Sequence, residues 1–478
     1  MKDNQNLNRR AFSGVMWKFS EQAGVQLAQL VTNITLARIL EPEDFGTIGI
    51  LTIFMAVSDV FIQQGFTTAL IQKKGTSELD YSSVFYANMG LAAVIYGILY
   101  VSAPWISDFY GEQQLTKMLR ILSISTVIGS FSTVQLAILS KTLDFRKSFF
   151  RGLSSTLAHG AVGIVLARSG FGVWSLVYSR IAGVLVGSIV LWVSVKWHPK
   201  AMFSVNSIRS LFGYSSRILG TRLLDTIFNN IHSVFIGKFF TISDLGYYQK
   251  GQQIPQMIMV ASDGSINQVL YPTLSILQDD LVSLKNALRR ALKTSMFITL
   301  PVMFGLIAVA EPLITILFTD KWLPSVPFMQ LACVICAFWP LSSTINALNA
   351  IGLSNVTLKL SLLTKVITLL FLAVSISFGI YAIMVSTILT SFVTTWITSY
   401  YVNMHIRYSI KELLLDILPP VALSIVMMVI VFLVGRVVVD IYTKVILQII
   451  TGATVYVTGA FMLRIDSLNY LVQLMRKR

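Results

Sequence analysis

Residues 417–436 read ILPPVALSIVMMVIVFLVGR, and Arg436 at the end is their only charged side chain. A helix of about 20 mostly apolar residues is long enough to cross a hydrocarbon layer roughly 30 Å thick. Comparable stretches recur along the whole chain instead of at one end. The sequence therefore predicts an all-α protein that crosses a membrane many times, not a soluble domain with a single anchor.

The composition favours the same class of fold. Hydrophobic residues make up 55% of the 478 positions and charged residues 12%, about half the usual charged share. Apolar windows predict about fourteen transmembrane helices. Three of them, 13–37, 211–237 and 246–272, are amphipathic, which indicates that they face a wet interior rather than lipid. The other windows are 45–64, 81–103, 116–138, 152–168, 171–194, 291–310, 326–349, 357–377, 379–402, 417–436 and 443–463.

Motifs of common enzymes are absent from the sequence. It contains no HExxH, no phosphate-binding glycine loop and no GxSxG, and its four histidines are scattered. Cys333 and Cys336 lie in an apolar run without further ligand residues, so we expect two small core residues rather than a metal or redox site. No catalytic activity, cofactor or metal is predicted.

Basic residues are distributed unevenly between the predicted connections. With the N-terminus in the cytoplasm, most of the 37 Lys and Arg residues fall in inward connections, whereas Glu41, Asp108 and Glu112 fall in outward ones. This bias predicts a multi-pass protein with both termini in the cytoplasm. It accounts for the formal charge of +15, so nucleic-acid binding is not expected. No small-residue cleavage site follows the basic start, so the first span should stay in the mature protein.

Parts of the first half of the chain recur in the second half. The clearest pairs relate Arg38, Leu40, Asp44 and Gly46 to Lys238, Phe240, Asp244 and Gly246. Further along the chain, Pro104, Ile106 and Tyr110 correspond to Pro312, Ile314 and Phe318, and Ser132, Thr133 and Gln135 correspond to Ser343, Thr344 and Asn346. They predict two parallel six-helix lobes, 1–200 and 201–405, with a substrate path between them, followed by two extra helices and a basic tail in 406–478.

Four short stretches carry a resemblance to a known family. They are RILEPEDFG at 38–46, GFTTALIQKK at 65–74, LSKTLDF at 139–145 and GFGVWSLV at 170–177. They resemble the polysaccharide transporter family of Wzx-type flippases, in its O-antigen and colanic acid exporter subgroup. The superfamily also holds the multidrug and toxin extrusion proteins and the peptidoglycan lipid flippase. The motifs are structural signatures and do not identify the sugar.

The resemblance implies a function and a set of partners. The expected protein is a two-lobed helical bundle in the bacterial cytoplasmic membrane. It would move an undecaprenyl-pyrophosphate-linked oligosaccharide from the cytoplasmic to the outer leaflet by alternating access. Glycosyltransferases and a polysaccharide polymerase would work beside it, and membrane lipids would surround it.

Cations inside the predicted spans are candidates for binding an anionic head group. Each charge in a span costs roughly 2.5 to 3.5 kcal/mol on insertion scales, so those that remain suggest function. Arginine can give a phosphate two donors at once. The ranked candidates are Arg217 and Arg222, then Lys18, then Arg180. The alternative is that Lys18 with Glu21 and Arg222 with Asp225 form i, i+3 ion pairs within a helix; for Lys365, a snorkelling structural role is favoured.

Acids inside the spans are candidates for ion coupling. Export against a gradient needs an energy source, and no nucleotide site is present. A buried carboxylate can exchange protons when its cavity opens to each side in turn. The candidates are Glu21, Asp59, Asp225 and Asp263.

Proline positions predict where the helices bend. Pro255, Pro301 and Pro340 fall within spans of the second lobe, where they should kink the helices. The first-lobe prolines, Pro42, Pro104 and Pro199, are assigned to connections. Bending during transport is therefore expected mainly in the second lobe.

Two alternative functions remain open at the level of sequence. One is a cation-coupled multidrug exporter of the same superfamily, which we expect to offer an acidic, aromatic-lined cavity. The other is a non-transporting membrane scaffold that recruits polysaccharide enzymes through basic cytoplasmic loops. The frequency of cations within the spans favours the flippase over the exporter.

Overall fold

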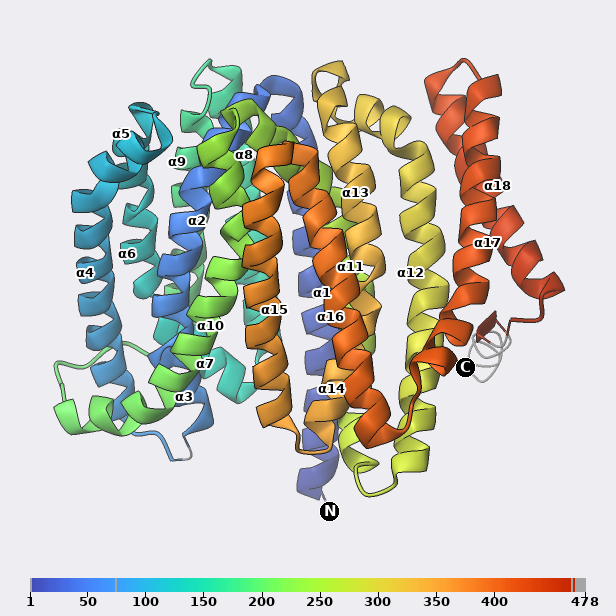
Figure 1. Ribbon diagram of the computed structural model, residues 1–478. Helices are drawn as coiled ribbons and strands as arrows, with labels where there is room; N and C mark the ends of the chain where they lie inside the picture. The colour runs from blue at the N-terminus through green and yellow to red at the C-terminus, as the bar shows by residue number, and fades with distance from the viewer. Residues whose placement is uncertain (1, 74, 466, 469–478) are drawn as a thin grey trace. The chain divides into compact units, whose positions relative to one another are not determined.

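The structure is a computed structural model, shown in Figure 1, and it describes residues 2–73, 75–465 and 467–468. Within the helices, the side chains of residues 2–16, 18, 19, 64, 214, 217 and 263–269 lie outside the described set. The described residues form helices joined by short connections, without a strand among them. The predicted all-α class is therefore confirmed.

Long helices make up most of the chain. The first nine are α1 (Lys2–Ile39), α2 (Pro42–Gln64), α3 (Phe66–Gln72), α4 (Glu78–Tyr110), α5 (Gln114–Leu122), α6 (Ile124–Ser130), α7 (Thr133–Thr142), α8 (Phe145–Arg168) and α9 (Trp174–Ser194). They are followed by α10 (Val205–Phe239), α11 (Ile242–Ile276), α12 (Leu281–Phe318), α13 (Val326–Ala337), α14 (Ser343–Ala350), α15 (Ser354–Ser375), α16 (Ile380–Ile406), α17 (Ile410–Val437) and α18 (Ile441–Met462). Short 3₁₀ turns lie at Asp320–Ser325, Trp339–Ser342 and Ile376–Phe378.

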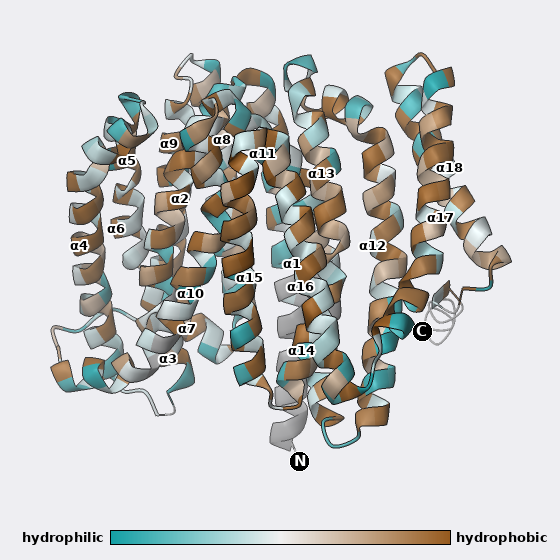
Figure 2. Cartoon of the chain, viewed as in Figure 1, coloured by the Kyte–Doolittle hydropathy of each residue, from teal (hydrophilic) through white to brown (hydrophobic). Residues whose placement is uncertain are grey.

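Each of the fourteen predicted windows falls on a helix or on a run of consecutive helices. Ten described helices or helix runs are long and apolar enough to cross a membrane. An eleventh results if the pair Gln114–Ser130 and Thr133–Thr142, bent by 44°, counts as one broken span. Apolar residues colour α4 and α15 brown along their length in Figure 2. The long helices α1, α10 and α11, which were predicted to be amphipathic, are not among these ten candidate spans. A total of fourteen spans requires all three of them, so it stays a prediction.

The chain divides into two compact units, Met1–Gly246 and Tyr247–Arg478, which we call unit 1 and unit 2. The division falls inside α11. The lobes predicted at 1–200 and 201–405, and the extra segment 406–478, rest on the sequence repeat and not on packing, so they stay predictions.

The two best-matched repeat segments have the same local structure. The backbone N–H of Glu41 donates to the Asp44 carboxylate at 3.0 Å at the start of α2, and that of Thr241 donates to the Asp244 carboxylate at 3.2 Å at the start of α11. An aspartate in the first turn thus caps both helices. The correspondence holds at these corners, and the duplication as a whole stays a prediction.

These two corners contact each other through glycine. A Cβ built on Gly46 would lie 1.9 Å from the carbonyl oxygen of Ile242, and one built on Gly246 would lie 2.0 Å from that of Pro42. Each glycine therefore packs directly against the first residue of the other helix. Only glycine permits backbones to approach this closely.

The proline prediction needs a correction. Pro104 was assigned to a connection, but it lies inside α4, which continues to Tyr110. A proline within the last turns of a long helix removes one hydrogen bond without ending the helix. In unit 2, Pro340 lies in the 3₁₀ turn Trp339–Ser342, which separates α13 from α14. Helix irregularities therefore occur in both units.

Cys333 and Cys336 lie on α13 and are 0% and 2% exposed. Both are free thiols. This agrees with the prediction of two small core residues. Around them, α13 packs against α12 and α16 within unit 2.

Candidate functional site

Unit 1 contains a polar cavity of about 580 Å³. Its wall is built by α1, α2, α6, α7, α8 and α9, and most of the side chains that line it carry hydroxyl, amide or charged groups. They are Gln29, Thr32, Asn33, Thr52, Asp59, Gln63, Ser125, Ser132, Thr133, Arg151, Ser155, Thr156, His159 and Arg180, with Gly129, Leu136, Gly183 and Val184. A cavity with this lining suits a polar ligand.

A stripe on α8 supplies one wall of the cavity. Arg151, Ser155 and His159 are spaced four residues apart, so they lie on the same helix face. The Ser155 hydroxyl donates to the carbonyl oxygen of Gly183 on α9 at 2.8 Å. A Cβ on Gly183 would lie 3.0 Å from the Ser155 carbonyl oxygen and 3.1 Å from the His159 Cβ. The glycine on α9 therefore sets the close spacing of the two helices.

Arg180 and Asp59 form an ion pair in the cavity wall. The Arg180 Nη2 atom on α9 donates to the Asp59 Oδ2 atom on α2 at 3.1 Å. The two side chains are 29% and 38% exposed. The sequence predicted Arg180 as a head-group ligand and Asp59 as an ion-coupling acid, and the fold brings the two together.

Arg151 is a cavity cation that the sequence analysis did not select. The predicted window 152–168 begins just after it, which leaves Arg151 in the preceding inward connection. In the structure α8 begins at Phe145, so Arg151 lies within the helix. Within the described part of the chain, its Nε atom is buried and has no hydrogen-bond acceptor. The four-residue spacing to Ser155 and His159 is the signal that could have revealed it.

Glu21 lies beside this stripe. Its carboxylate accepts a hydrogen bond from the Ser148 hydroxyl of α8 at 2.9 Å. A Cβ on Gly152, next to Arg151, would lie 3.4 Å from Glu21 Oε1. Glu21 is thus close to the α8 stripe but is not part of the cavity lining.

The other predicted site residues are not brought into this cavity by the described structure. Arg222 is exposed on α10, and Asp225 is partly buried on the same helix. The side chains of Lys18, Arg217 and Asp263 lie outside the described residues. Roles for all five stay predictions. Lys365, for which a structural role was favoured, is partly buried on α15.

The charges in the cavity favour an anion. Its lining holds two guanidinium groups, Arg151 and Arg180, against one carboxylate, Asp59, with the imidazole of His159 in addition. Arginine keeps its charge at any physiological pH. No group of three or more metal-ligating side chains occurs among the residues that the structure describes.

Unit 2 contains a cavity of the opposite character, with a volume of about 430 Å³. It lies among α12, α17 and α18, and its lining includes Val302, Leu306, Val309, Leu313, Met427, Val431, Ile449 and Val457. Two polar side chains lie in its wall. Gln448 donates to the Val431 carbonyl at 3.1 Å, while its Oε1 atom is buried without a partner in the described structure, and Tyr456 donates to the Phe297 carbonyl at 2.9 Å. This cavity suits an apolar chain.

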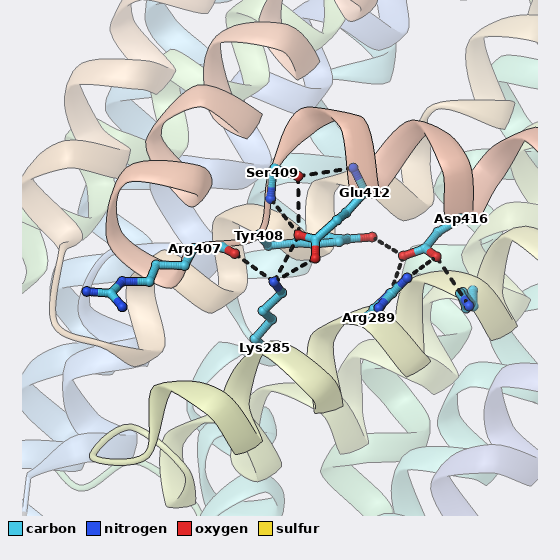
Figure 3. Close-up of polar contacts among 8 residues, drawn as sticks. Lys285, Arg289, Arg407, Tyr408, Ser409, Glu412 and Asp416 are labelled. Atoms are coloured by element: carbon cyan, nitrogen blue, oxygen red, sulfur yellow. Dashed lines mark hydrogen bonds and ion pairs between the residues drawn. The ribbon is translucent and has the colours of Figure 1, made fainter.

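A cluster of charged residues joins α12 to α17 at the start of both helices (Figure 3). Lys285 contacts both oxygens of Glu412 at 2.9 Å. Four residues further on, Arg289 donates through Nε and Nη2 to the two oxygens of Asp416 at 2.5 and 2.7 Å. The Tyr408 hydroxyl donates to Asp416 at 2.9 Å, and burial together with this carboxylate raises the pKa of Tyr408. The i, i+4 spacing on both helices brings the opposite charges together.

Two of the sequence motifs meet at a junction in unit 1. Lys73 pairs with Asp80 at 2.8 Å. Lys141 donates to the Lys73 carbonyl at 2.7 Å and to the Thr76 hydroxyl at 2.8 Å. Lys73 and Lys141, one from each motif, thus hold the connection between α3 and α4 against the end of α7, which is a structural role.

Residues 35–327 match the family described as "Polysaccharide biosynthesis protein". The chain belongs to this family. The match covers more than half of the sequence, and it includes all four motifs and the cavity-lining residues of unit 1 other than those on α1. The resemblance stated from the motifs is therefore confirmed.

Curated relatives of the chain have names from polysaccharide pathways. The chain is 26% identical over 358 residues to the succinoglycan biosynthesis transport protein ExoT of Rhizobium meliloti (strain 1021), which covers 74% of this chain and 72% of the relative. It is 24% identical to the teichuronic acid biosynthesis protein TuaB of Bacillus subtilis (strain 168), with 69% of each chain covered. It is 23% identical to the lipopolysaccharide biosynthesis protein WzxC of Escherichia coli (strain K12), covering 69% and 68%.

Solved structures share the fold. The lipid II flippase MurJ in an inward closed conformation aligns with a TM-score of 0.77 at 16% identity, covering 95% of this chain and all of MurJ. An inward-facing MATE family multidrug transporter aligns with a TM-score of 0.64 at 16% identity, covering 81% and 94%. The chain is thus a multi-pass membrane protein with a fold common to flippases and drug exporters.

Proposed function

We propose that the protein is a flippase for a lipid-linked polysaccharide repeat unit. Its cargo would be an oligosaccharide on undecaprenyl pyrophosphate, moved from the cytoplasmic to the outer leaflet of the bacterial cytoplasmic membrane. The observation that carries the proposal is the polar cavity of unit 1, in which Arg151 and Arg180 outnumber the single carboxylate of Asp59. Membership of a polysaccharide biosynthesis family supports the choice of cargo.

The chemistry of the cavity supports an anionic head group as its ligand. A guanidinium group can donate two parallel hydrogen bonds to a phosphate, and such charge-assisted bonds are the stronger ones. Arg151 and Arg180 come from neighbouring helices, and the buried Nε atom of Arg151 is without an acceptor in the described structure. Two guanidinium groups suit the two phosphates of a pyrophosphate.

Other parts of the cargo need other surfaces. The serine, threonine and amide side chains of the unit 1 cavity can exchange hydrogen bonds with sugar hydroxyls. The apolar cavity of unit 2 offers a surface of the kind that a long prenyl chain requires. Each cavity, taken within its own unit, suits the chemistry of one part of such a cargo.

The remaining elements of the proposal come from the sequence. Transport would occur by alternating access, with both termini in the cytoplasm and with glycosyltransferases and a polymerase as partners. Arg217, Arg222 and Lys18 stay proposed head-group ligands beside Arg180. Asp59 is the coupling candidate that lines the described cavity, while Glu21, Asp225 and Asp263 are further candidates.

Reconstitution of the full chain in liposomes tests the proposal. Liposomes would carry an undecaprenyl-pyrophosphate-linked disaccharide in both leaflets, and a glycosidase added outside would report which leaflet holds the sugar. With the wild-type protein, the whole pool should become cleavable. The double variant Arg151→Ala/Arg180→Ala should leave the inner share protected, while Arg168→Ala, at the exposed end of α8, should behave as wild type.

The same liposomes separate the alternative functions. Full cleavage with Arg151→Ala/Arg180→Ala would contradict a head-group role for the cavity. A wild-type chain that leaves the sugar protected but moves a lipophilic cation would indicate a multidrug exporter. Failure to move either compound, with normal insertion, would favour the scaffold.

A further inference from the structure

Two arginine–aspartate pairs in this chain are built very differently. In unit 2, Asp416 is 5% exposed and accepts two hydrogen bonds from Arg289, one from Tyr408, and a contact from Lys293 at 3.2 Å. Every side of this carboxylate is occupied, so the pair has the form of a permanent link between helices. A ligand could reach Asp416 only if several contacts broke together.

The Arg180–Asp59 pair has the opposite features. One hydrogen bond of 3.1 Å joins the two groups, and the Asp59 side chain is 38% exposed. A guanidinium group has five N–H donors, and this bond uses one of them. Partly exposed pairs with a single contact contribute little free energy. Both partners also line the polar cavity, so a ligand there can reach the pair directly.

We propose that Asp59 is an internal competitor of the cargo, which holds Arg180 in the empty cavity and is displaced when a phosphate group of the cargo binds that guanidinium. The inference rests on the proposed function and adds a role for one residue in it. The pyrophosphate of the cargo carries two negative charges and four non-bridging oxygens, against one charge and two oxygens in a carboxylate, so it can take over the arginine. When the cavity opens to the other side, Asp59 recaptures Arg180 and favours release.

Competition from Asp59 lowers the apparent affinity of the protein for its cargo. The cargo binds only the fraction of molecules in which Arg180 is released from Asp59, and its apparent dissociation constant rises accordingly. Removing the competitor should tighten binding about threefold to fivefold, which corresponds to about 0.7 to 1 kcal/mol, the upper part of the range for partly exposed pairs. Asp59 would thus be a positioning residue whose loss strengthens binding but slows turnover.

Farnesyl diphosphate is a suitable probe, because it carries the diphosphate on a short prenyl chain. Its binding to the full chain in maltoside micelles would be measured by calorimetry, with farnesol as the phosphate-free reference. Asp59→Asn should bind it about threefold to fivefold more tightly than wild type. Asp59→Glu, which retains the carboxylate, should bind it as wild type does, and Arg180→Gln should bind it more weakly.

A matched control removes a carboxylate outside the cavity. Asp144 pairs with Lys147 at 3.2 Å and caps the start of α8. Asp144→Asn changes the net charge by the same amount and keeps a capping oxygen, so it should bind the probe as wild type does. In liposomes, Asp59→Asn should turn over more slowly than Asp144→Asn despite its tighter binding.

The outcomes separate this inference from the proposed function. Unchanged or weaker binding by Asp59→Asn, with weaker binding by Arg180→Gln, would overturn the competitor role and leave the head-group site intact. If wild type binds farnesyl diphosphate no better than farnesol, the proposed function fails and the competitor role fails with it. Should Asp59→Asn melt well below wild type, Asp59→Ser would take its place, and the same comparison of affinities would decide.

Discussion

Gly46 at the start of α2 and Ile242 at the start of α11 are in backbone contact, and no side chain fits between them. A Cβ on Gly46 would lie 1.9 Å from the Ile242 carbonyl oxygen. The reverse contact, between Gly246 and Pro42, is equally close. The segments that recur in the two halves of the sequence therefore touch each other at their glycines.

Replacing Gly46 with alanine should destabilise the protein. The obstructing atom is a backbone oxygen, so the helices must shift, at a cost of about 1 to 3 kcal/mol. Thermal melting of the detergent-solubilised chain measures the loss. Gly90→Ala in α4, where nothing lies within 4 Å of the new Cβ, is the control and should melt at or above the wild-type temperature. Equal melting of Gly46→Ala and Gly90→Ala would refute the tight contact.

Asp416→Ala should lower stability more than Glu412→Ala. The first change leaves Arg289 and Lys293 without their carboxylate and removes the acceptor of Tyr408, whereas the second removes the partner of Lys285. Because Arg289 is 36% exposed, water compensates part of the loss, and we expect about 1 to 3 kcal/mol for Asp416 and under 1 for Glu412. Melting temperatures give the order, and a reversed order would contradict a central role of Asp416.

Lys141→Met should loosen the connection between α3 and α4. The change removes the hydrogen bonds to the Lys73 carbonyl and the Thr76 hydroxyl, and methionine keeps much of the side-chain volume. Amide hydrogen exchange in residues 75–80 should become faster. Lys147→Met, at a surface ion pair, should leave exchange there unchanged. Slow exchange in both variants would show that Lys141 is not what holds the connection.

Gly183→Ala should reduce binding of the cargo more than it reduces stability. Its Cβ would press on the Ser155 backbone and on His159, and so displace the α8 stripe relative to Arg180. We expect about tenfold weaker binding of farnesyl diphosphate, the equivalent of one charge-assisted hydrogen bond. Gly97→Ala in α4 has open space around it and should bind normally. Normal binding by Gly183→Ala would show that the spacing of α8 and α9 does not affect binding at the site.

The predicted topology can be tested by cysteine labelling in whole cells. Cys333 and Cys336 are buried, so background labelling should be low. With fourteen spans and a cytoplasmic N-terminus, Ser169→Cys should react with an impermeant maleimide from outside. Lys196→Cys should react only after permeabilisation. Both positions are exposed, and the reverse pattern would invert the predicted orientation.

The positions of the helices and the all-α class could be predicted from the sequence, because the length of an apolar stretch is enough to indicate a membrane span. The windows fell on helices, and the three amphipathic ones were recognised as different from the rest. The broken span of α5 to α7 was not foreseen, because a 44° bend at Phe131 and Ser132 leaves the hydropathy of the window unchanged. Helix ends were also underestimated where polar residues extend a helix beyond its apolar part, as at Arg151.

The candidate site was predicted only in part. Arg180 and Asp59 were selected separately as charges inside spans, but 121 positions separate them, and hydropathy carries no information on which helices are neighbours. Ion pairs within one helix were the pairings considered, whereas the described pair joins two helices. The highest-ranked residues, Arg217 and Arg222, lie on a helix that does not line the described cavity, and their roles await experiment.

The α8 stripe has a consequence for how relatives could differ in cargo. Arg151, Ser155 and His159 occupy three successive turns of one helix, while the distance between α8 and its neighbour depends on Gly183. The side chains that face the cavity and the residue that sets the distance between α8 and α9 thus occupy different positions in the sequence. A lineage could exchange one glycan for another by altering a handful of inward-facing side chains, with the scaffold around them inherited unchanged.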